Sequence, residues 1–527
     1  MAKEIINADF PEQIGISSNE IKALLDDFKR NNIELHSVKI LRHGKCAFEG
    51  YAHPYNASTP HTMYSVSKSF TAVAIGFMFS EGRLTPDTKV IDLFPDFKPQ
   101  KEDKFLEEMT IFHLLTMTAG KSVSVIADKT KNTWVRDFFH SKWGYEPGNG
   151  WEYISENTYI CSVIIKRLTG LSLIDYLTPR LFKPLGIERR PFWECDPEGQ
   201  EAGGWGLFIT TDELARFILC LQQGGIYDGE QVIPADFVKT ATSHLVDNNR
   251  RDANSHAGYG YFFWMNEMEN SYRADGMFSQ FGIVFKDYDA AFICTCSEIN
   301  EVKTLDCIMR HFPGMFCDEK AEKPEGSCVC LTIDPLPCLP GGKRSVMEEF
   351  IKGKRISFLK NPVLNIAKFP VSMLPMPVVY MSANKGGNID NVIFDFSENE
   401  CTMSWDEGRE HNTIKCGMDG KERYSPIHLA GMDFTAVSTA AWSDDSTLKI
   451  HMRPLESISE RQITFVFNGS SVTAYPETSP ALSTMTESLA ADCADFIPGE
   501  TLAAICAVPI SKADILVEFP MKGRLNR

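Results

Sequence analysis

A long apolar stretch begins after Ser65 and ends at Glu81 and Gly82. It leaves little polar surface, because its members include Ala72, Val73, Ala74, Ile75, Phe77, Met78 and Phe79. A helix that is hydrophobic on nearly every side packs inside a protein. The pattern therefore predicts a buried helix over residues 66–81, with Lys68 in its first turn.

The rest of the first 317 residues alternates between helical and strand-like segments. Periodic segments, most with glycine or proline near their ends, predict helices at about 110–118, 157–169, 172–181, 211–223 and 301–311. Short β-rich runs predict strands at 38–41, 47–51, 283–285 and 291–295. Strands at both ends with helices between them indicate an α/β (α+β) domain, in which an antiparallel sheet is flanked by helices and carries a helical insertion. We place this domain at residues 1–317.

The remainder of the chain has a different pattern. Proline, glycine and cysteine are frequent from about 318 to 342, and we assign residues 318–375 to a linker, with a short helix expected around 346–351. Beyond it the runs at 391–396, 447–452 and 462–467 read as strands separated by turns such as Asn468-Gly469. This spacing predicts a C-terminal all-β domain at residues 376–527, built as a lipocalin-like barrel or a sandwich.

Composition narrows the class of protein. A hydrophobic fraction of 43% with 23% charged residues is typical of globular domains with real cores. The formal net charge of −17 argues against binding to nucleic acid, which needs clustered cations. The first residues lack the apolar core of a secretory signal, and no apolar run approaches the roughly 20 residues of a membrane-spanning helix. We expect a soluble cytoplasmic protein without a membrane partner, or one whose leader has been removed.

The 15 cysteines are odd in number and scattered, which suits reduced thiols in the cytosol. One cluster, consisting of Cys317, Cys328, Cys330 and Cys338, could hold zinc. It lacks the paired Cys-x-x-Cys spacing of such sites, so we expect no metal there. Cys294 and Cys296 are expected to lie on one face of a strand.

The segment at the start of the buried helix carries candidate chemistry. Ser65 and Lys68 are three residues apart and therefore lie on one helical face. A serine hydroxyl is a poor nucleophile unless a neighbouring base takes its proton, and a lysine removed from water loses its charge more readily. The helix N-terminus also directs backbone N–H groups toward developing negative charge. The alternative is a helix cap followed by a solvated lysine, and the apolar setting argues against it.

Several segments in order resemble one known family. Residues 59–72, which contain Ser65-Val66-Ser67-Lys68, together with 81–84 and 109–120, are similar to the serine β-lactamase and penicillin-binding-protein-like family. This family includes class C β-lactamases, D-Ala-D-Ala peptidases, carboxylesterases and 6-aminohexanoate-dimer hydrolases. The resemblance covers about residues 1–315 and implies Ser65 as the nucleophile, with Lys68 beside it.

The family's second catalytic element, Tyr-x-Asn, is matched by Tyr153-Ile154-Ser155. The resemblance implies that Tyr153 acts with Lys68 as the base and later as the acid. Ser155 replaces the asparagine, which resembles the esterase and aminohexanoate-hydrolase branch, and its hydroxyl can still bond Lys68 or substrate. The alternative for Tyr153 is a core tyrosine with a satisfied hydroxyl.

The third element is Lys-Thr-Gly or His-x-Gly in the family, and we place it at Ala274-Asp275-Gly276. Gly276 would let substrate lie against the strand, and the N–H of Met277 would complete an oxyanion hole with that of Ser65. A slip in register would move this role to Phe278 or Gln280.

Two departures from the family occur in this element. Ser279 stands where a Gly-x-x-Gly-Gln variant has its second glycine, and Ala274 stands where the family has a cation. That cation receives the carboxylate of β-lactams and D-Ala-D-Ala peptides, so its loss argues against both substrates. Gly203-Gly204-Trp205 is also similar to the family, and we assign it to the scaffold, although Trp205 could line the pocket.

Together these features predict a serine hydrolase that forms an acyl-enzyme on a small ester or amide. No metal and no organic cofactor are implied, and the oligomeric state is not indicated. One alternative is a D-aminopeptidase or another peptidase of the same family, with the β domain restricting access to the cleft. A second is a non-catalytic binding or scaffold protein on the same fold.

Overall fold

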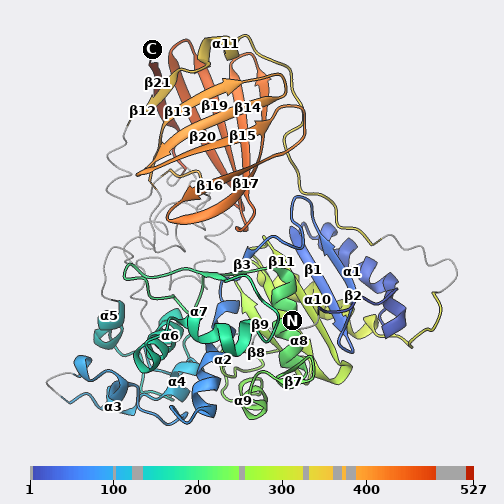
Figure 1. The fold of residues 1–527 in the computed structure, drawn as a ribbon, viewed down its shortest axis with the longest axis vertical. Helices are drawn as coiled ribbons and strands as arrows, with labels where there is room; N and C mark the ends of the chain where they lie inside the picture. The colour runs from blue at the N-terminus through green and yellow to red at the C-terminus, as the bar shows by residue number, and fades with distance from the viewer. Residues whose placement is uncertain are drawn as a thin grey trace. The chain divides into compact units, whose positions relative to one another are not determined.

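The computed structural model describes residues 4–98, 102–121, 134–248, 256–323, 331–359, 371–374, 387–481 and 518–526. The chain forms two compact units, Met1–Asp334 and Pro335–Arg527, which are shown as ribbons in Figure 1. Each unit has its own hydrophobic core and is described by itself.

An antiparallel six-stranded sheet organises the first unit. Its strand order is β2-β1-β11-β10-β9-β8, so the first strands of the chain pair with a strand near residue 290. The strands are β1 (Leu35–Arg42), β2 (Lys45–Tyr51), β8 (Trp264–Met265), β9 (Ser271–Gly276), β10 (Gln280–Phe285) and β11 (Ala290–Cys296). The predicted antiparallel sheet with strands from both ends of this region is therefore confirmed.

Helices cover both faces of this sheet. On one face, α1 (Ser18–Arg30) and α10 (Glu301–Met315) share a core with alternate residues of β11, including Phe292 and Cys294. On the other face lies α8 (Thr211–Gln222), whose Thr211 hydroxyl bonds Ser37 at 2.6 Å. Because both faces are covered, every residue of β10 and β11 is buried, which explains their continuous apolar runs.

The helical insertion follows β2 and contains the predicted buried helix. This helix, α2 (Val66–Ser80), is buried at every position from residue 66 to residue 78. It packs against β9 and α6. The other helices of the insertion are α3 (Lys104–Glu108), α4 (Ile111–Leu115), α5 (Trp134–His140), α6 (Ser155–Thr169), α7 (Leu173–Leu177) and α9 (Ala235–Ala241).

Two predicted helices are shorter in the structure. The helix predicted at 110–118 ends at Leu115, because Met117 has a left-handed backbone with φ of 61°. The helix predicted at 172–181 is regular only to Leu177 and continues as a π-helical turn, Thr178–Phe182, which contains Pro179. Proline lacks the N–H that an α-helix needs at this position. Short strands complete the unit, namely β3 (His61–Thr62), β4 (Phe192–Trp193), β5 (Leu207–Ile209), β6 (Ile226–Tyr227) and β7 (Glu230–Gln231).

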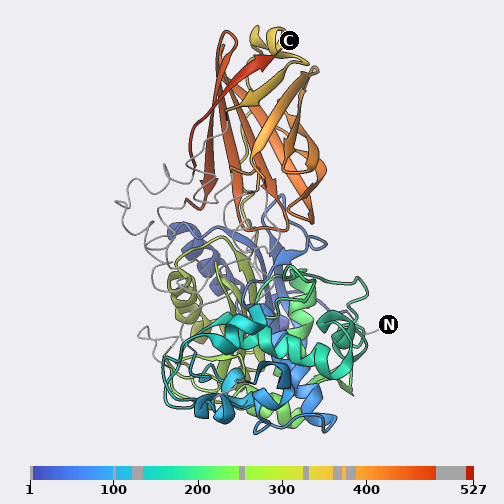
Figure 2. The same cartoon turned by 90° about the vertical axis from the view of Figure 1, so that its left-hand side faces the viewer.

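The second unit is a β-barrel. The predicted all-β domain is therefore confirmed, and of the two predicted architectures it is the barrel and not the sandwich. A 10-stranded sheet closes on itself where β15 meets β17 at Gly417 and Thr439. Figure 2 shows the curved sheet of this unit from another side. Its strands are β12 (Arg355–Phe358), β13 (Ile389–Phe396), β14 (Glu400–Glu407), β15 (Glu410–Gly417), β16 (Arg423–Leu429), β17 (Met432–Asp444), β18 (Thr447–Pro454), β19 (Glu460–Asn468), β20 (Ser471–Ser479) and β21 (Met521–Asn526). A short helix, α11 (Met347–Ile351), precedes them, so α11 and β12 lie within the segment predicted as a linker.

The barrel interior is filled by the alternate side chains of its strands. In β14 these are Cys401, Met403 and Trp405, each with no exposed surface. Cys401 stands directly opposite Cys416 of β15, and burial raises the pKa of both thiols. Both are free thiols in the structure.

A short segment of chain, Val371–Leu374, is buried in the barrel core. Glu407, at the end of β14, holds it there: its carboxylate accepts bonds from the Ser372 hydroxyl, the Met373 N–H at 3.1 Å and the Trp405 indole at 3.2 Å. Burial raises the pKa of Glu407 to about 7, although these three donors oppose the shift.

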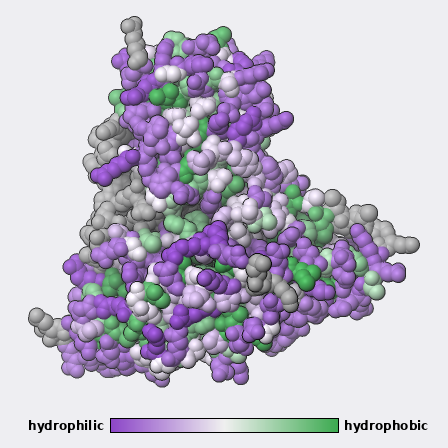
Figure 3. Space-filling model, in the orientation of Figure 1, coloured by the Kyte–Doolittle hydropathy of each residue, from purple (hydrophilic) through white to green (hydrophobic). Residues whose placement is uncertain are grey.

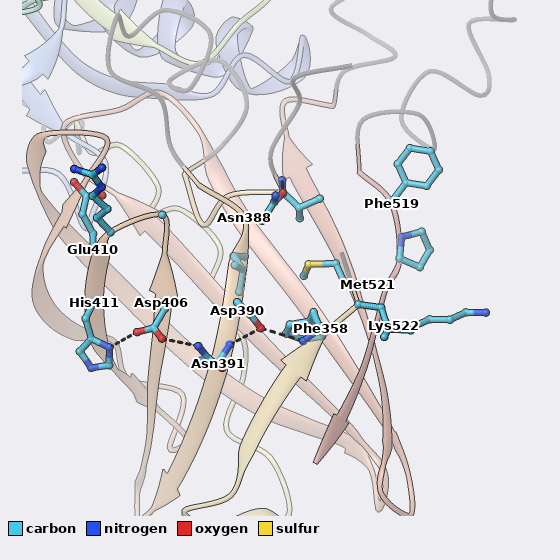
Figure 4. A pocket seen from close by; sticks show the side chains of 16 residues that line it. Phe358, Asn388, Asp390, Asn391, Asp406, Glu410, His411, Phe519, Met521 and Lys522 are labelled. Carbon is cyan, nitrogen blue, oxygen red and sulfur yellow. Dashed lines mark hydrogen bonds and ion pairs between the residues drawn. The ribbon is translucent and has the colours of Figure 1, made fainter. Parts of the chain in front are cut away.

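A cavity of about 820 Å³ lies beside this region of the barrel. A hydrogen-bonded row of side chains runs along it, in which His411 and Asn391 both contact the carboxylate of Asp406, at 2.7 and 2.8 Å (Figure 4). Asp390 accepts the N–H groups of Asn391 and Phe358. Strand β13 has a bulge between Asp390 and Ile393. A bulge interrupts the strict alternation of side chains along a strand, and so changes the direction of the side chains at this point of the row.

Hydrophilic residues dominate the face of the molecule seen in Figure 3, and hydrophobic residues are scattered among them. Within the described ranges, no helix has the length and apolar character that crossing a bilayer requires.

We predict that Glu407 makes the barrel less stable as pH rises. Because the folded pKa of about 7 lies above the ordinary value of 4.5, folding favours the protonated form. This contribution to stability is complete below about pH 4.5 and is lost as pH rises through 7, a change on the order of 3 kcal/mol. Glu407→Gln should remove this dependence of stability on pH. Hydrogen–deuterium exchange in β14, corrected for the intrinsic effect of pH on exchange, should then be slower in the variant than in the wild type at pH 8 and similar in the two proteins at pH 5. Faster exchange in the variant at pH 8 would contradict the assignment.

Candidate active site

Ser65 occupies the N-cap position of α2, but its hydroxyl does not cap the helix. The residue itself has a helical backbone, with φ of −71° and ψ of −10°, whereas Tyr64 before it is left-handed, with φ of 42°. A bulky residue in this conformation is strained, and such strain concentrates at functional sites. Ser65 is partly exposed, whereas the residues on either side of it are buried.

The amine of Lys68 lies beside the Ser65 hydroxyl, as the spacing predicted. Its Nζ is 2.9 Å from Ser65 Oγ, 3.1 Å from Ser155 Oγ and 2.9 Å from the carbonyl oxygen of Gly204. Lys68 is 1% exposed, so it is not the solvated lysine of the alternative interpretation. A buried amine with three oxygen neighbours is held in a single orientation.

Tyr153 lies next to this amine. Lys68 Nζ is 4.8 Å from the centroid of the Tyr153 ring, which is within the range of a cation–π contact. The Tyr153 ring belongs to an aromatic cluster with Trp151, Tyr259 and Trp264, whose centroids lie 5.3 to 6.3 Å from it. Burial raises the pKa of Tyr259 well above its ordinary value. The structure thus brings Ser65, Lys68 and Tyr153 together.

Ser155 is placed by the start of α6, where it is the first helical residue and is 2% exposed. Because α6 packs against α2, the Ser155 hydroxyl faces Lys68 at the 3.1 Å given above. The serine that replaces the family's asparagine therefore reaches the lysine.

The third predicted element lies at the end of β9, next to the chain that leads to Ser65. A Cβ added at Gly276 would be 2.5 Å from the carbonyl oxygen of Met63, so only glycine allows this approach to the chain before Ser65. Met277 follows in the turn and is partly exposed. The Phe278 N–H donates to Glu301 Oε1 at 2.8 Å, which argues against the alternative register that would give Phe278 the oxyanion role.

The strand that carries Gly276 contains an ion pair between Arg273 and Asp275, and it has no cation at the position of Ala274. Ala274 is fully buried, and Asp275 next to it bonds Arg273 Nε at 2.6 Å. Arg273 is 1% exposed, donates to Asn266 at 2.7 Å and lies over the Trp264 ring at 5.5 Å. Its charge is therefore matched by that of Asp275.

Gly204 is a contact of the site that the sequence interpretation placed in the scaffold. Its carbonyl oxygen accepts a bond from Lys68, and its backbone lies against Ser155, where an added Cβ would be 3.1 Å from the Ser155 carbonyl. The adjacent Gly203 has φ of 70°. Two successive glycines between a tyrosine motif and a capped helix are the signal that could have indicated this close approach.

A buried histidine pair supports the chain that leads to Ser65. His61 of β3 directs Nδ1 to the carbonyl of Thr62 at 2.9 Å, and its Nε2 is 2.9 Å from His36 Nδ1. A carbonyl only accepts, so His61 carries its proton on Nδ1 and accepts from His36. Burial, together with His36, lowers the pKa of His61 to about 3, so this ring is neutral. His36 also contacts Glu34 at 3.0 Å.

Metal ligands do not gather in the described ranges, where no group of three or more His, Cys, Asp or Glu side chains is arranged to hold an ion. Of the four cysteines considered for zinc, Cys317 and Cys338 are free thiols. Cys328 and Cys330 lie outside the described residues.

Comparison with known proteins adds to this geometry. Protein flp of Staphylococcus aureus (strain NCTC 8325 / PS 47) is 28% identical over 217 residues, which cover 38% of this chain and 43% of flp. Esterase EstB of Burkholderia gladioli is 26% identical over 205 residues, covering 34% of this chain and 52% of EstB. The chain thus spans about half the length of these relatives. A solved penicillin-binding protein homolog from Caulobacter crescentus covers 56% of this chain and 99% of its own, with 15% identity and a TM-score of 0.47.

The family model described as Beta-lactamase matches residues 23–298, which is more than half of the chain and includes Ser65, Lys68, Tyr153 and Gly276. The chain therefore belongs to the beta-lactamase family.

Proposed function

We propose that this protein hydrolyses a small ester or amide through an acyl-enzyme on Ser65. The observation that carries the proposal is the buried Lys68 amine, 2.9 Å from the Ser65 hydroxyl and covered by the Tyr153 ring. A serine hydroxyl becomes nucleophilic when such a neighbour removes its proton. This arrangement places a buried amine beside a partly exposed nucleophile.

In the first half-reaction, the coupled Tyr153 and Lys68 take the Ser65 proton while Ser65 Oγ attacks the carbonyl carbon of the substrate. The Gly204 carbonyl and the Ser155 hydroxyl keep the amine in place during this step. The tetrahedral intermediate then collapses, and Tyr153 returns the proton to the leaving alcohol or amine. The product of this half-reaction is an ester between Ser65 and the acyl group.

The negative charge on the substrate oxygen is held by backbone N–H groups in this scheme. One is that of Ser65 at the start of α2, and the other is that of Met277 after Gly276. The contact of Gly276 with the Met63 carbonyl supports this pairing, since it brings the end of β9 next to the chain that leads to Ser65. Water then attacks the acyl-enzyme, with the same base taking its proton, and releases the acid.

The substrate class follows from the charges at the end of β9. Ala274 provides no cation, and the Arg273 charge is already paired with Asp275 at 2.6 Å. A substrate carboxylate would therefore find no unmatched cation in this strand, which disfavours β-lactams and D-Ala-D-Ala peptides. The similarity to a relative named as an esterase supports the ester alternative.

We predict that a fluorophosphonate probe labels the wild-type protein on the peptide that contains Ser65. The phosphorus should bond to Ser65 Oγ with loss of fluoride, so mass spectrometry should find the adduct on this residue. Ser65→Ala should abolish labelling, whereas Ser80→Ala, at the far end of the same helix, should leave it unchanged. Absence of labelling in a folded wild-type protein would favour a non-catalytic scaffold instead.

A second prediction concerns the phenol of Tyr153. Tyr153→Phe keeps the ring beneath Lys68 but removes the proton carrier, so kcat/KM for a p-nitrophenyl ester should fall by about 100-fold or more. Tyr259→Phe is the matched control, because it removes the hydroxyl of a neighbouring tyrosine and leaves Tyr153 intact. The ring centroids of Tyr153 and Tyr259 are 6.3 Å apart. Equal losses in the two variants would indicate a packing effect and not proton transfer.

A third prediction concerns specificity. The purified protein should hydrolyse short acyl esters at least about 100-fold more efficiently, by kcat/KM, than a chromogenic cephalosporin, because strand β9 offers the cephalosporin carboxylate no unmatched cation. Rapid cephalosporin turnover would overturn the interpretation of Ala274.

A further inference from the structure

The turn between β9 and β10 holds two successive residues in a conformation that L-amino acids avoid. Phe278 has φ of 63° and Ser279 has φ of 65°. Such a backbone persists only where surrounding contacts impose it. The two residues directly follow Met277, so contacts that fix them restrain the Met277–Phe278 peptide, which adjoins the peptide that carries the Met277 N–H.

Gln280 imposes part of this conformation from inside the turn. Its side-chain amide donates to the carbonyl oxygens of Phe278 at 2.9 Å and Met277 at 3.3 Å, and to that of Cys296 in β11 at 2.8 Å. Gln280 is fully buried, so water does not compete for these bonds. Its amide thus ties the turn to the centre of the sheet.

Glu301 holds the turn from outside. It is the first residue of α10, and its carboxylate accepts the Phe278 N–H at 2.8 Å. The positive end of the helix dipole stabilises a carboxylate at this position. From the same helix, Thr304 bonds the Ser279 hydroxyl at 2.9 Å. Helix α10 therefore fixes both left-handed residues.

The opposite side of the turn rests on the residue before the nucleophile. The Phe278 ring packs against the Tyr64 ring with centroids 5.1 Å apart, and both side chains are buried. The turn is therefore clamped between α10 and the chain that carries Ser65.

We propose that Glu301 and Gln280 are positioning residues that hold the Met277 N–H in place for the oxyanion, through the clamped turn Met277–Ser279. The inference rests on the proposed acyl-enzyme function. Neither residue touches the reacting atoms; each acts through the backbone of the turn.

The test compares Glu301→Ala with Glu301→Gln, using Val302→Ala as the matched control. Glutamine keeps an acceptor oxygen for the Phe278 N–H, and Val302 is an exposed neighbour on the first turn of α10. Loss of a whole oxyanion donor costs about 100- to 1000-fold in kcat, so a misplaced donor in Glu301→Ala should lower kcat about 10- to 100-fold. KM should change by less than about threefold, since the interaction forms in the transition state. Glu301→Gln should recover most of kcat, and Val302→Ala should match the wild type.

A transition-state analogue provides a second readout. Phenylboronic acid bonds to a catalytic serine oxygen and forms a tetrahedral anion in the place of the oxyanion. Its affinity should fall in Glu301→Ala by about the same factor as kcat/KM. If Glu301→Ala does not fold, Glu301→Asp, which keeps the charge and withdraws the oxygen by one methylene group, should show the same pattern in milder form.

The outcomes separate this inference from the proposed function. If the wild type labels at Ser65 and hydrolyses esters, but Glu301→Ala keeps kcat and boronate affinity within about twofold of Val302→Ala, the positioning role is wrong and the acyl-enzyme stands. If the wild type does not label at Ser65, the proposed function itself fails.

Discussion

A lysine amine enclosed in the apolar interior of the first unit is the constraint on which the site depends. Water would stabilise the charge of Lys68, but α2 is buried along its length, so the amine relies on the oxygens of Ser65, Ser155 and Gly204. Each of these comes from a different element, and each must approach closely. The glycine pair before Trp205 and the start of α6 beside α2 supply two of these approaches, and the strained Tyr64 directly precedes the residue that supplies the third.

Much of the site could be predicted from the sequence because its signals are local. Ser65 and Lys68 are one helical turn apart, and an apolar run identifies the buried helix that carries them. The Gly204 contact could not be found in this way, since it joins residues 136 positions apart and uses a backbone carbonyl that every residue type possesses. The left-handed turn after Met277 was also hidden, because phenylalanine and serine give no sign of such a backbone.

The fold shows the same division between local and distant causes. The helices and the sheet of the first unit follow from periodic apolar patterns. Two helices are shorter than predicted, because Met117 has a left-handed backbone and Pro179 lacks an N–H group. In the barrel, the runs at 391–396, 447–452 and 462–467 were visible, whereas β12 with four residues was too short to detect. Closure between Gly417 and Thr439 depends on pairing across the ring, which no local pattern encodes.

The paired thiols of Cys401 and Cys416 have a practical consequence. They face each other across β14 and β15 with no exposed surface, and their raised pKa values keep them protonated at neutral pH. An alkylating reagent needs both access and a thiolate. The rate at which such a reagent modifies these two cysteines therefore reports how often the barrel opens.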